Sequence, residues 1–243
     1  MRTGEGELFY ERATQLLADA QEARNLFGGP GQTPRGRLRI DVPVALAKPF
    51  IVPNLPAFMR RYPEIDLILG VSDQSADLLA DGIDCVVRLG DIAITSMISR
   101  VVGQVRMVTC GAPTYLAEHG MPQTLDDLPS HRAVTYFAGR GRRTIDWHFA
   151  VDGGDRIVKM RPGILVNETE AFIACALAGL GLIQAVGIGV EEHLKAGRLV
   201  EVLPRLTTVE RAVSVMYPNR QHLAPQVRVF IDWVSDLFSS VEQ

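Results

Sequence analysis

The sequence predicts an α/β fold in which strands alternate with helices along the chain. Apolar, strand-like runs occupy residues 37–42, 65–71 and 83–88. An amphipathic segment ending at Tyr62 separates the first two runs, and a short helical segment at 75–81 separates the second from the third. A parallel α/β arrangement requires this alternation. It places strand ends and helix starts on one rim of the sheet, where small ligands bind.

The rest of the chain continues the pattern and adds a second half. A long strand at 99–110 is expected to cross from the first half into the second. Pro113 should begin a helix, because proline suits the first helical turn. The last helix has apolar residues at helical spacing and should pack on the first half. The other predicted strands lie at 133–136, 144–149, 156–160, 163–166, 181–184 and 211–217, and the other helices at 168–178, 190–195 and 226–237.

The N-terminal segment predicts a separate helix. Apolar side chains fall at positions 9, 13, 16, 20, 23 and 27, in alternating steps of four and three. This spacing makes a narrow seam that favours pairing with another helix. The stretch 28–34 is rich in glycine and proline and serves as a connector. We therefore predict a linker helix with its connector at 1–34.

The globular part is predicted to form two subdomains. Subdomain one comprises 35–111 and 216–243, and subdomain two comprises 112–215. The two crossings between them, near Cys110 and Met216, should act as a hinge.

Composition excludes several classes of protein. A formal charge of −3 and a pI near 6.0 give no basic footprint for nucleic acid. No apolar run reaches the roughly 18 residues of a membrane span, and no secretory signal is visible, so we predict a cytoplasmic location without membrane contact. The three cysteines are widely spaced in apolar surroundings and are interpreted as buried, reduced thiols. They are Cys85, Cys110 and Cys175.

Motifs for catalysis or metal binding are lacking in the sequence. The five histidines, at 119, 131, 148, 193 and 222, lie far apart and without metal-ligand spacing. No Gly-x-Ser-x-Gly elbow, phosphate loop or Cys-x-x-Cys pair occurs. A basic cluster at 139–143 is best interpreted as a solvated loop, although it could receive an anion or contact DNA. We predict that the chain is not an enzyme and binds no metal or cofactor.

A series of motifs in order along the chain resembles one family. The motifs are Gly36-Arg-Leu-Arg-Ile-Asp-Val-Pro-Val, Phe58-Met-Arg-Arg-Tyr-Pro-Glu-Ile-Asp-Leu, Asp77-Leu-Leu-Ala-Asp-Gly-Ile-Asp-Cys-Val-Val-Arg-Leu-Gly, Cys110-Gly-Ala-Pro-Thr-Tyr-Leu, Val166-Asn-Glu-Thr-Glu-Ala, Ala176-Leu-Ala-Gly-Leu-Gly-Leu-Ile-Gln and Gly197-Arg-Leu-Val-Glu-Val-Leu-Pro. Together they are similar to the effector-binding domain of LysR-type transcriptional regulators. The resemblance implies a fold like that of type 2 periplasmic solute-binding proteins, with two α/β subdomains joined by two crossing strands and an inducer cleft between them.

The resemblance also implies partners. A winged helix-turn-helix normally precedes this domain, whereas this chain starts Met1-Arg-Thr-Gly-Glu-Gly-Glu-Leu, which resembles the end of the wing and the start of the linker helix. Either the chain is truncated or it is a natural ligand-binding remnant. DNA binding is expected only through the absent domain, and RNA polymerase contact only in the complete regulator. A homodimer or tetramer is implied, with the helix 48–62 of one subunit antiparallel to the helix 168–178 of the other, and with Phe58 as a test position if it faces the partner.

Two helix starts should face the predicted effector cleft. Backbone N–H groups at a helix start lack partners within the helix and favour an anion. One start is at 44–48, and the other at 167–170, where Asn167 or Thr169 can cap the helix. Simple helix capping is the alternative interpretation for both. The resemblance implies that Ala45, Leu46, Ala47 and Thr169 form the wall of the cleft.

Positions at the carboxyl ends of strands complete the predicted site, because such ends border the crevice of open α/β sheets. For Arg88, and for Asp91 beside it, a surface salt bridge is the alternative. The apolar residues of the predicted site leave the cleft with few fixed charges, so an aromatic or aliphatic acid fits better than a sugar; they are Ala45, Leu46, Ala47, Leu89 and Val186. The predicted role is sensing of a small-molecule effector, and the alternative is a stand-alone solute-binding protein of the same fold. The positions are Ser72, Asp73, Arg88, Leu89, Tyr136, Phe137, Gln184 and Val186.

Overall fold

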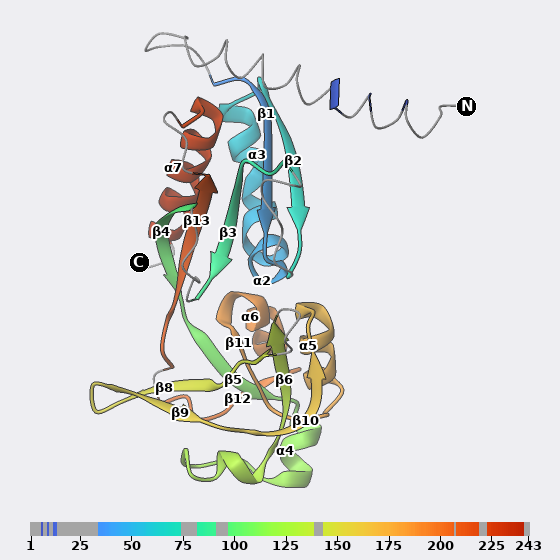
Figure 1. The fold of residues 1–243 in the computed structure, drawn as a ribbon. Helices are drawn as coiled ribbons and strands as arrows, with labels where there is room; N and C mark the ends of the chain where they lie inside the picture. Colours follow the sequence, from blue (N-terminus) through green and yellow to red (C-terminus); the bar gives the residue numbers. More distant parts are fainter. Residues whose placement is uncertain are drawn as a thin grey trace.

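The computed structural model of the chain describes residues 6, 9, 12–13, 34–73, 82–90, 97–138, 143–206, 208–218 and 223–240. Its helices and strands form two groups, one above the other in Figure 1. Most of the predicted N-terminal helix, the predicted helix at 75–81 and residues 139–142 of the basic cluster lie outside the described residues.

The upper group contains a five-stranded sheet in the order β2-β1-β3-β13-β4. β1 is parallel to β2 and β3, whereas β13 is antiparallel to β3 and β4. The α/β alternation predicted from the sequence is thus confirmed for the first three strands. Bounds are β1 Gly36–Val42, β2 Ile65–Val71, β3 Cys85–Leu89, β4 Met97–Val105 and β13 Arg211–Pro218.

Two helices cover this sheet with aromatic side chains. α7 (Pro225–Ser239) presents Phe230 and Trp233 to α3 (Val52–Arg61), and the rings of both contact the ring of Phe58. Phe58 is fully buried in this core. The condition that Phe58 faces a partner subunit is therefore not met, because its side chain points into its own domain.

The helical segment between β1 and β2 is irregular at its start. It begins as α2 (Val44–Leu46), widens into a π turn, η1 (Ala47–Ile51), and continues as α3. Pro49 lies within the π turn and cannot donate a backbone hydrogen bond, which favours a departure from α geometry at this point. The irregular turn lies where this segment meets the lower group, because α2 contacts α5 and α6.

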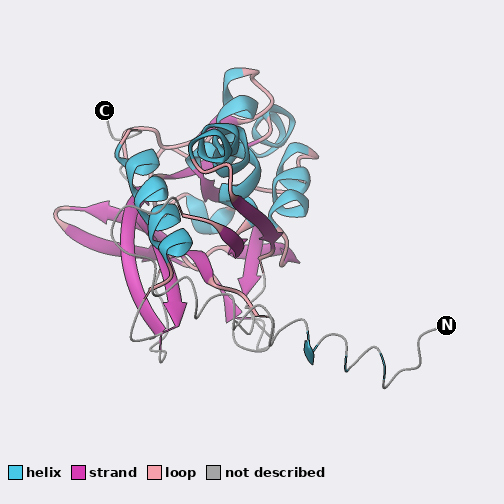
Figure 2. Cartoon of the chain, turned by 90° about the horizontal axis from the view of Figure 1, so that it is seen from above, coloured by secondary structure: helices cyan, strands magenta, loops and turns pink. Residues whose placement is uncertain are grey.

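The lower group contains three small sheets and several short helices. β5 pairs with β11 and β12, β6 with β10 and β7, and β8 with β9. In the view of the chain from above, most helices lie toward the top of the picture and most strands toward the bottom (Figure 2). Bounds are β5 Met107–Gly111, β6 Arg132–Ala138, β7 Arg143–Thr144, β8 Trp147–Val151, β9 Gly154–Val158, β10 Arg161–Val166, β11 Ile183–Val186, β12 Val200–Glu201, α4 Pro113–His119, η2 Leu128–Ser130, α5 Thr169–Leu177 and α6 Gly187–Lys195.

Two predicted strands differ from the structure. The run at 99–110 is divided at Arg106, because β4 belongs to the five-stranded sheet and β5 to the lower group. The run at 144–149 is also divided, with its first residue in β7 and its last three in β8. In each case one apolar pattern spans two strands that hydrogen-bond to different partners. The subdomain boundaries at residues 111 and 216 stay a prediction.

Candidate functional site

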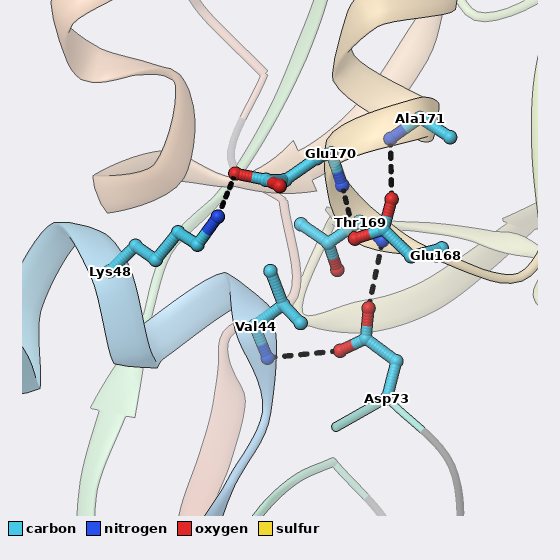
Figure 3. Close-up of polar contacts among 7 residues, drawn as sticks. All are labelled: Val44, Lys48, Asp73, Glu168, Thr169, Glu170 and Ala171. Carbon is cyan, nitrogen blue, oxygen red and sulfur yellow. Dashed lines mark hydrogen bonds and ion pairs between the residues drawn. The ribbon is translucent and has the colours of Figure 1, made fainter. Parts of the chain in front are cut away.

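One carboxylate connects the two groups of elements. The backbone N–H of Val44 donates to Oδ1 of Asp73, with N···O 3.0 Å. The backbone N–H of Thr169 donates to Oδ2 of the same side chain, with N···O 2.8 Å. Val44 begins α2 beside the five-stranded sheet, and Thr169 begins α5 in the lower group. Figure 3 shows the Asp73 carboxylate between these two helix starts.

The end of β2 places Asp73 in this position. The Ser72 N–H donates to the carbonyl oxygen of Val42 (N···O 3.1 Å), so the chain after β2 stays beside the end of β1. The helix that follows β1 starts at Val44, one turn residue further on. A helix start has unpaired N–H groups and a partial positive charge, and a carboxylate satisfies both.

The start of α5 holds a second carboxylate. Glu168 is the N-cap, and its side chain accepts hydrogen bonds from the N–H groups of Glu170 (2.9 Å) and Ala171 (2.8 Å). The prediction that Asn167 or Thr169 caps this helix is wrong. Glutamate is long enough to reach back to the second and third N–H groups, which leaves the Thr169 N–H for Asp73.

An ion pair lies beside these hydrogen bonds. Nζ of Lys48, in η1, is 2.5 Å from Oε1 of Glu170, in α5 (Figure 3). Both side chains are more than half exposed, so water screens the pair and its contribution to stability is small. The site thus holds the carboxylates of Asp73, Glu168 and Glu170 with Lys48 as a cation.

Tyr136 adds a hydroxyl donor to the same region. Its O–H donates to the carbonyl oxygen of Asn167 (3.1 Å), and its ring packs edge-on against Phe172. Burial, and then the nearby negative charge of Asp73, raise the pKa of Tyr136 well above its usual range. The phenol therefore stays protonated at neutral pH and can donate only as a neutral group.

Arg88 belongs to a second, separate polar pair. Its Nη1 lies 2.9 Å from Oδ1 of Asp41 and also donates to the carbonyl oxygen of Val87. The Asp41 side chain is 7% exposed, so the pair is largely shielded from water. Gly70 lies against it, and a Cβ at that position would be 2.9 Å from Oδ2 of Asp41. Arg88 thus forms a salt bridge, as the alternative interpretation expected, but with a buried partner and not at the surface.

The comparisons with known proteins identify the family. The family model described as the LysR substrate binding domain matches residues 31–239. The chain belongs to the LysR family of transcriptional regulators. It is 38% identical over 233 residues to an uncharacterized HTH-type transcriptional regulator, YhjC, of Escherichia coli, covering 96% of this chain and 78% of that protein.

Two further matches agree in sequence and in fold. An HTH-type transcriptional repressor of Pseudomonas aeruginosa is 34% identical over 237 residues, covering 98% of this chain and 75% of the repressor. CrgA, a LysR-type regulator from Neisseria meningitidis, superposes with a TM-score of 0.72 at 24% identity, over 97% of this chain and 80% of CrgA. The expected type 2 periplasmic-binding-protein-like fold is confirmed.

Among the predicted LysR effector residues, direct interactions connect Asp73 with Thr169, and Tyr136 lies beside them. Leu46 and Ala47 have no exposed surface, and Val186 is also buried; all three belong to the hydrophobic core cluster of the five-stranded sheet. Ser72, Ala45, Leu89 and Phe137 are half-buried. All of these positions stay predictions as effector contacts.

Gln184 is engaged in the protein interior. Its side-chain oxygen accepts from the His148 N–H (3.2 Å), and its amide nitrogen lies 3.4 Å from both the His148 carbonyl oxygen and Oγ1 of Thr109. These contacts account for the buried amide without a ligand.

Sequence reasoning missed Lys48, Glu168 and Glu170. Lys48 and Glu170 are 122 positions apart, so no local pattern in the sequence indicates that they pair. Among the described residues, no three histidine, cysteine, aspartate or glutamate side chains are placed so that they could hold a metal ion together. Among the described helices, none is both long and apolar enough to cross a membrane.

Proposed function

We propose that this LysR-family chain senses a small-molecule effector at the junction between α2 and α5, and passes the signal to DNA through the helix-turn-helix domain of the complete regulator. The observation that supports this best is the Asp73 carboxylate, which accepts hydrogen bonds from helix starts in both groups. A ligand bound there would contact both groups at once, together with neighbouring positions such as Ala45 and Tyr136.

Sensing requires that the ligand distinguishes two states of the chain. A ligand that touches both groups binds the closed arrangement better than an open one and shifts the equilibrium by that difference in affinity. The two covalent passages between the groups, β4 to β5 and the entry into β13, can act as a hinge. The linker helix would then transmit the change to the DNA-binding domains.

The alternative of a stand-alone solute-binding protein has less support. The related chains are HTH-type transcriptional regulators, and the matches extend over three quarters or more of their length. We further propose that the chain acts in the cytoplasm and catalyses no reaction.

Sensing is tested by a thermal-shift screen of carboxylic acids, aromatic metabolites, amino acids and sugars. At a hundredfold excess over its dissociation constant, a ligand adds about 2.7 kcal/mol to stability. For a chain of this size, that raises the melting temperature by roughly 5 to 10 °C. A shift confined to one chemical class, with a change in the solution scattering profile, would support sensing. A bound ligand that left the scattering profile unchanged would contradict the closure mechanism.

We propose that the domain forms a dimer through α3 and α5. Exposed apolar side chains lie on α3 (Val52, Met59) and on the edge strand β2 beside it (Ile68, Val71). If α3 of one subunit packs antiparallel to α5 of the other, the contact is isologous and buries this patch twice.

A single charge tests this dimer. Met59→Glu should convert the dimer to a monomer in multi-angle light scattering. The matched control is Val101→Glu on β4, an exposed apolar position (60%) at the other edge of the five-stranded sheet. An unchanged mass for Met59→Glu, or monomers for both variants, would exclude the proposed arrangement.

A further inference from the structure

Asp73 differs from an ordinary helix cap in what it connects. A capping side chain accepts N–H groups from the helix that it begins, as Glu168 does with Glu170 and Ala171. Asp73 instead accepts from residues 29 and 96 positions away, in two helices that follow different strands. One side chain from the end of β2 therefore joins the upper group to the lower group.

The carboxylate also occupies the place where the sequence predicts an external acid. The two N–H groups that would receive an effector carboxylate already donate to Asp73 at 3.0 and 2.8 Å. Glu168 accepts the next two N–H groups of α5, and Glu170 adds a third negative charge, which is paired with Lys48. An incoming carboxylate would meet excess negative charge unless Asp73 moved away.

We infer that Asp73 is a resident anion that latches the two groups together in the absence of effector, so that an acidic effector must displace it. This inference rests on the proposed sensing site and specifies how that site is regulated. The latch holds the two groups in the arrangement seen here through two charge-assisted hydrogen bonds, which are stronger than neutral ones. Displacement frees Asp73 and passes both N–H donors to the ligand, whose own size then sets a different, ligand-closed arrangement of the two groups.

Chemical rescue tests the latch with acetate as the probe. Asp73→Ala should lower the melting temperature by on the order of 6 to 20 °C, because two hydrogen bonds to a charged group are lost. Sodium acetate at ten times its dissociation constant should restore roughly 3 to 6 °C, compared with sodium chloride at equal ionic strength. The wild-type chain should not respond, because Asp73 already fills the position.

Glu168→Ala is the matched control. It also removes a carboxylate that accepts two helix N–H groups, but only within α5. It should lose stability with little acetate response, because the hydrogen bonds of Glu168 are exposed and water can replace them, whereas those of Asp73 are part-buried. Equal acetate stabilisation of the wild type, or rescue of both variants, would overturn the inference. An absence of rescue in Asp73→Ala would do so too.

If Asp73→Ala does not fold, amide hydrogen exchange in Asp73→Asn tests the latch instead. Exchange at Val44 and Thr169 should be about tenfold faster than in the wild type, because a neutral amide accepts more weakly and cannot accept from both with equal strength. Glu168→Ala should accelerate Glu170 and Ala171 but not Val44. Unchanged exchange at Val44 and Thr169 in Asp73→Asn would overturn the latch.

The outcomes separate the latch from sensing itself. A wild-type hit in the effector screen, with no rescue of Asp73→Ala, would leave sensing intact and exclude the latch. Rescue of Asp73→Ala with a silent screen would establish the latch and contradict sensing of the classes that were screened.

Discussion

Replacing Arg88 with methionine should destabilise the chain far more than the same replacement of Arg100. Both arginines form ion pairs, with N···O 2.9 Å to Asp41 and 3.0 Å to Asp232. The surroundings differ, because the Asp41 side chain is 7% exposed and that of Asp232 is 55% exposed. Methionine keeps much of the apolar stem and removes the charged group, so the comparison isolates the effect of burial.

The magnitude follows from what each substitution leaves behind. Removing one partner of a buried pair costs about 3 to 5 kcal/mol, because the other charge stays buried without compensation. The Arg88 side chain is 22% exposed, so water reaches part of the pair, and we expect a loss of about 3 kcal/mol. The exposed pair of Arg100 should contribute only about 0 to 1 kcal/mol. The melting temperature should fall by roughly 6 to 12 °C for Arg88→Met and by less than about 4 °C for Arg100→Met.

Urea unfolding followed by circular dichroism measures the difference in unfolding free energy. The double variant Asp41→Asn, Arg88→Met should recover part of the loss, since a neutral amide needs no counter-charge. The reasoning would be refuted if both arginine variants lost equal stability, or if the double variant were no more stable than Arg88→Met.

Three further predictions use other parts of the chain. Gly103→Ala should lower the unfolding free energy by about 1 to 3 kcal/mol, because the added Cβ would lie 2.4 Å from a phenylalanine side chain of α7. The control in the same urea assay is Gly154→Ala, where the nearest atom would lie 3.6 Å from the added Cβ. Burial lowers the pKa of His131 in the folded state, so its contribution to stability should be complete above the usual histidine pKa of 6.5 and should fall as the pH drops below that value. Between pH 7.5 and 5.5, the melting temperature of His131→Gln should therefore fall less than that of the wild type. An equal fall in both would contradict this. Burial raises the pKa of two thiols, one of them to about 12, so a thiol reagent should modify one cysteine in the native chain and three after unfolding. The two buried thiols, which should react only after unfolding, are those of Cys85 and Cys110; the thiol that should react in the native chain is that of Cys175.

Local patterns predicted the regular elements well. The predicted bounds of β2 agree with the structure, and those of β1 and β13 agree to within one residue at each end. The division at Arg106 could not be predicted in the same way, because β4 and β5 each have strand-forming residues and differ only in their distant partners. β12, with two residues, is too short to produce any periodicity.

The site was predicted in outline but not in its contacts. The rule that ligands lie at strand ends and helix starts selected Asp73 and Thr169 separately. Their hydrogen bond spans 96 positions, and nothing in the sequence between them indicates it. The segment 167–170 offers four polar residues that could cap a helix, and general preferences favour Asn167 or Thr169 over the glutamate that does so.

Asp41 lies near the end of β1 and Asp73 follows β2, the neighbouring parallel strand, but the protein compensates their charges in different ways. Asp41 is neutralised by the guanidinium of Arg88, whereas Asp73 is held by the backbone N–H groups of Val44 and Thr169. Loss of Arg88 leaves a net charge without a partner, which water reaches poorly. Loss of the Asp73 carboxylate leaves two neutral donors, which water or a small anion can satisfy. Of the two carboxylates, only that of Asp73 can therefore be exchanged for a ligand at modest cost, and regulation at this junction depends on that difference.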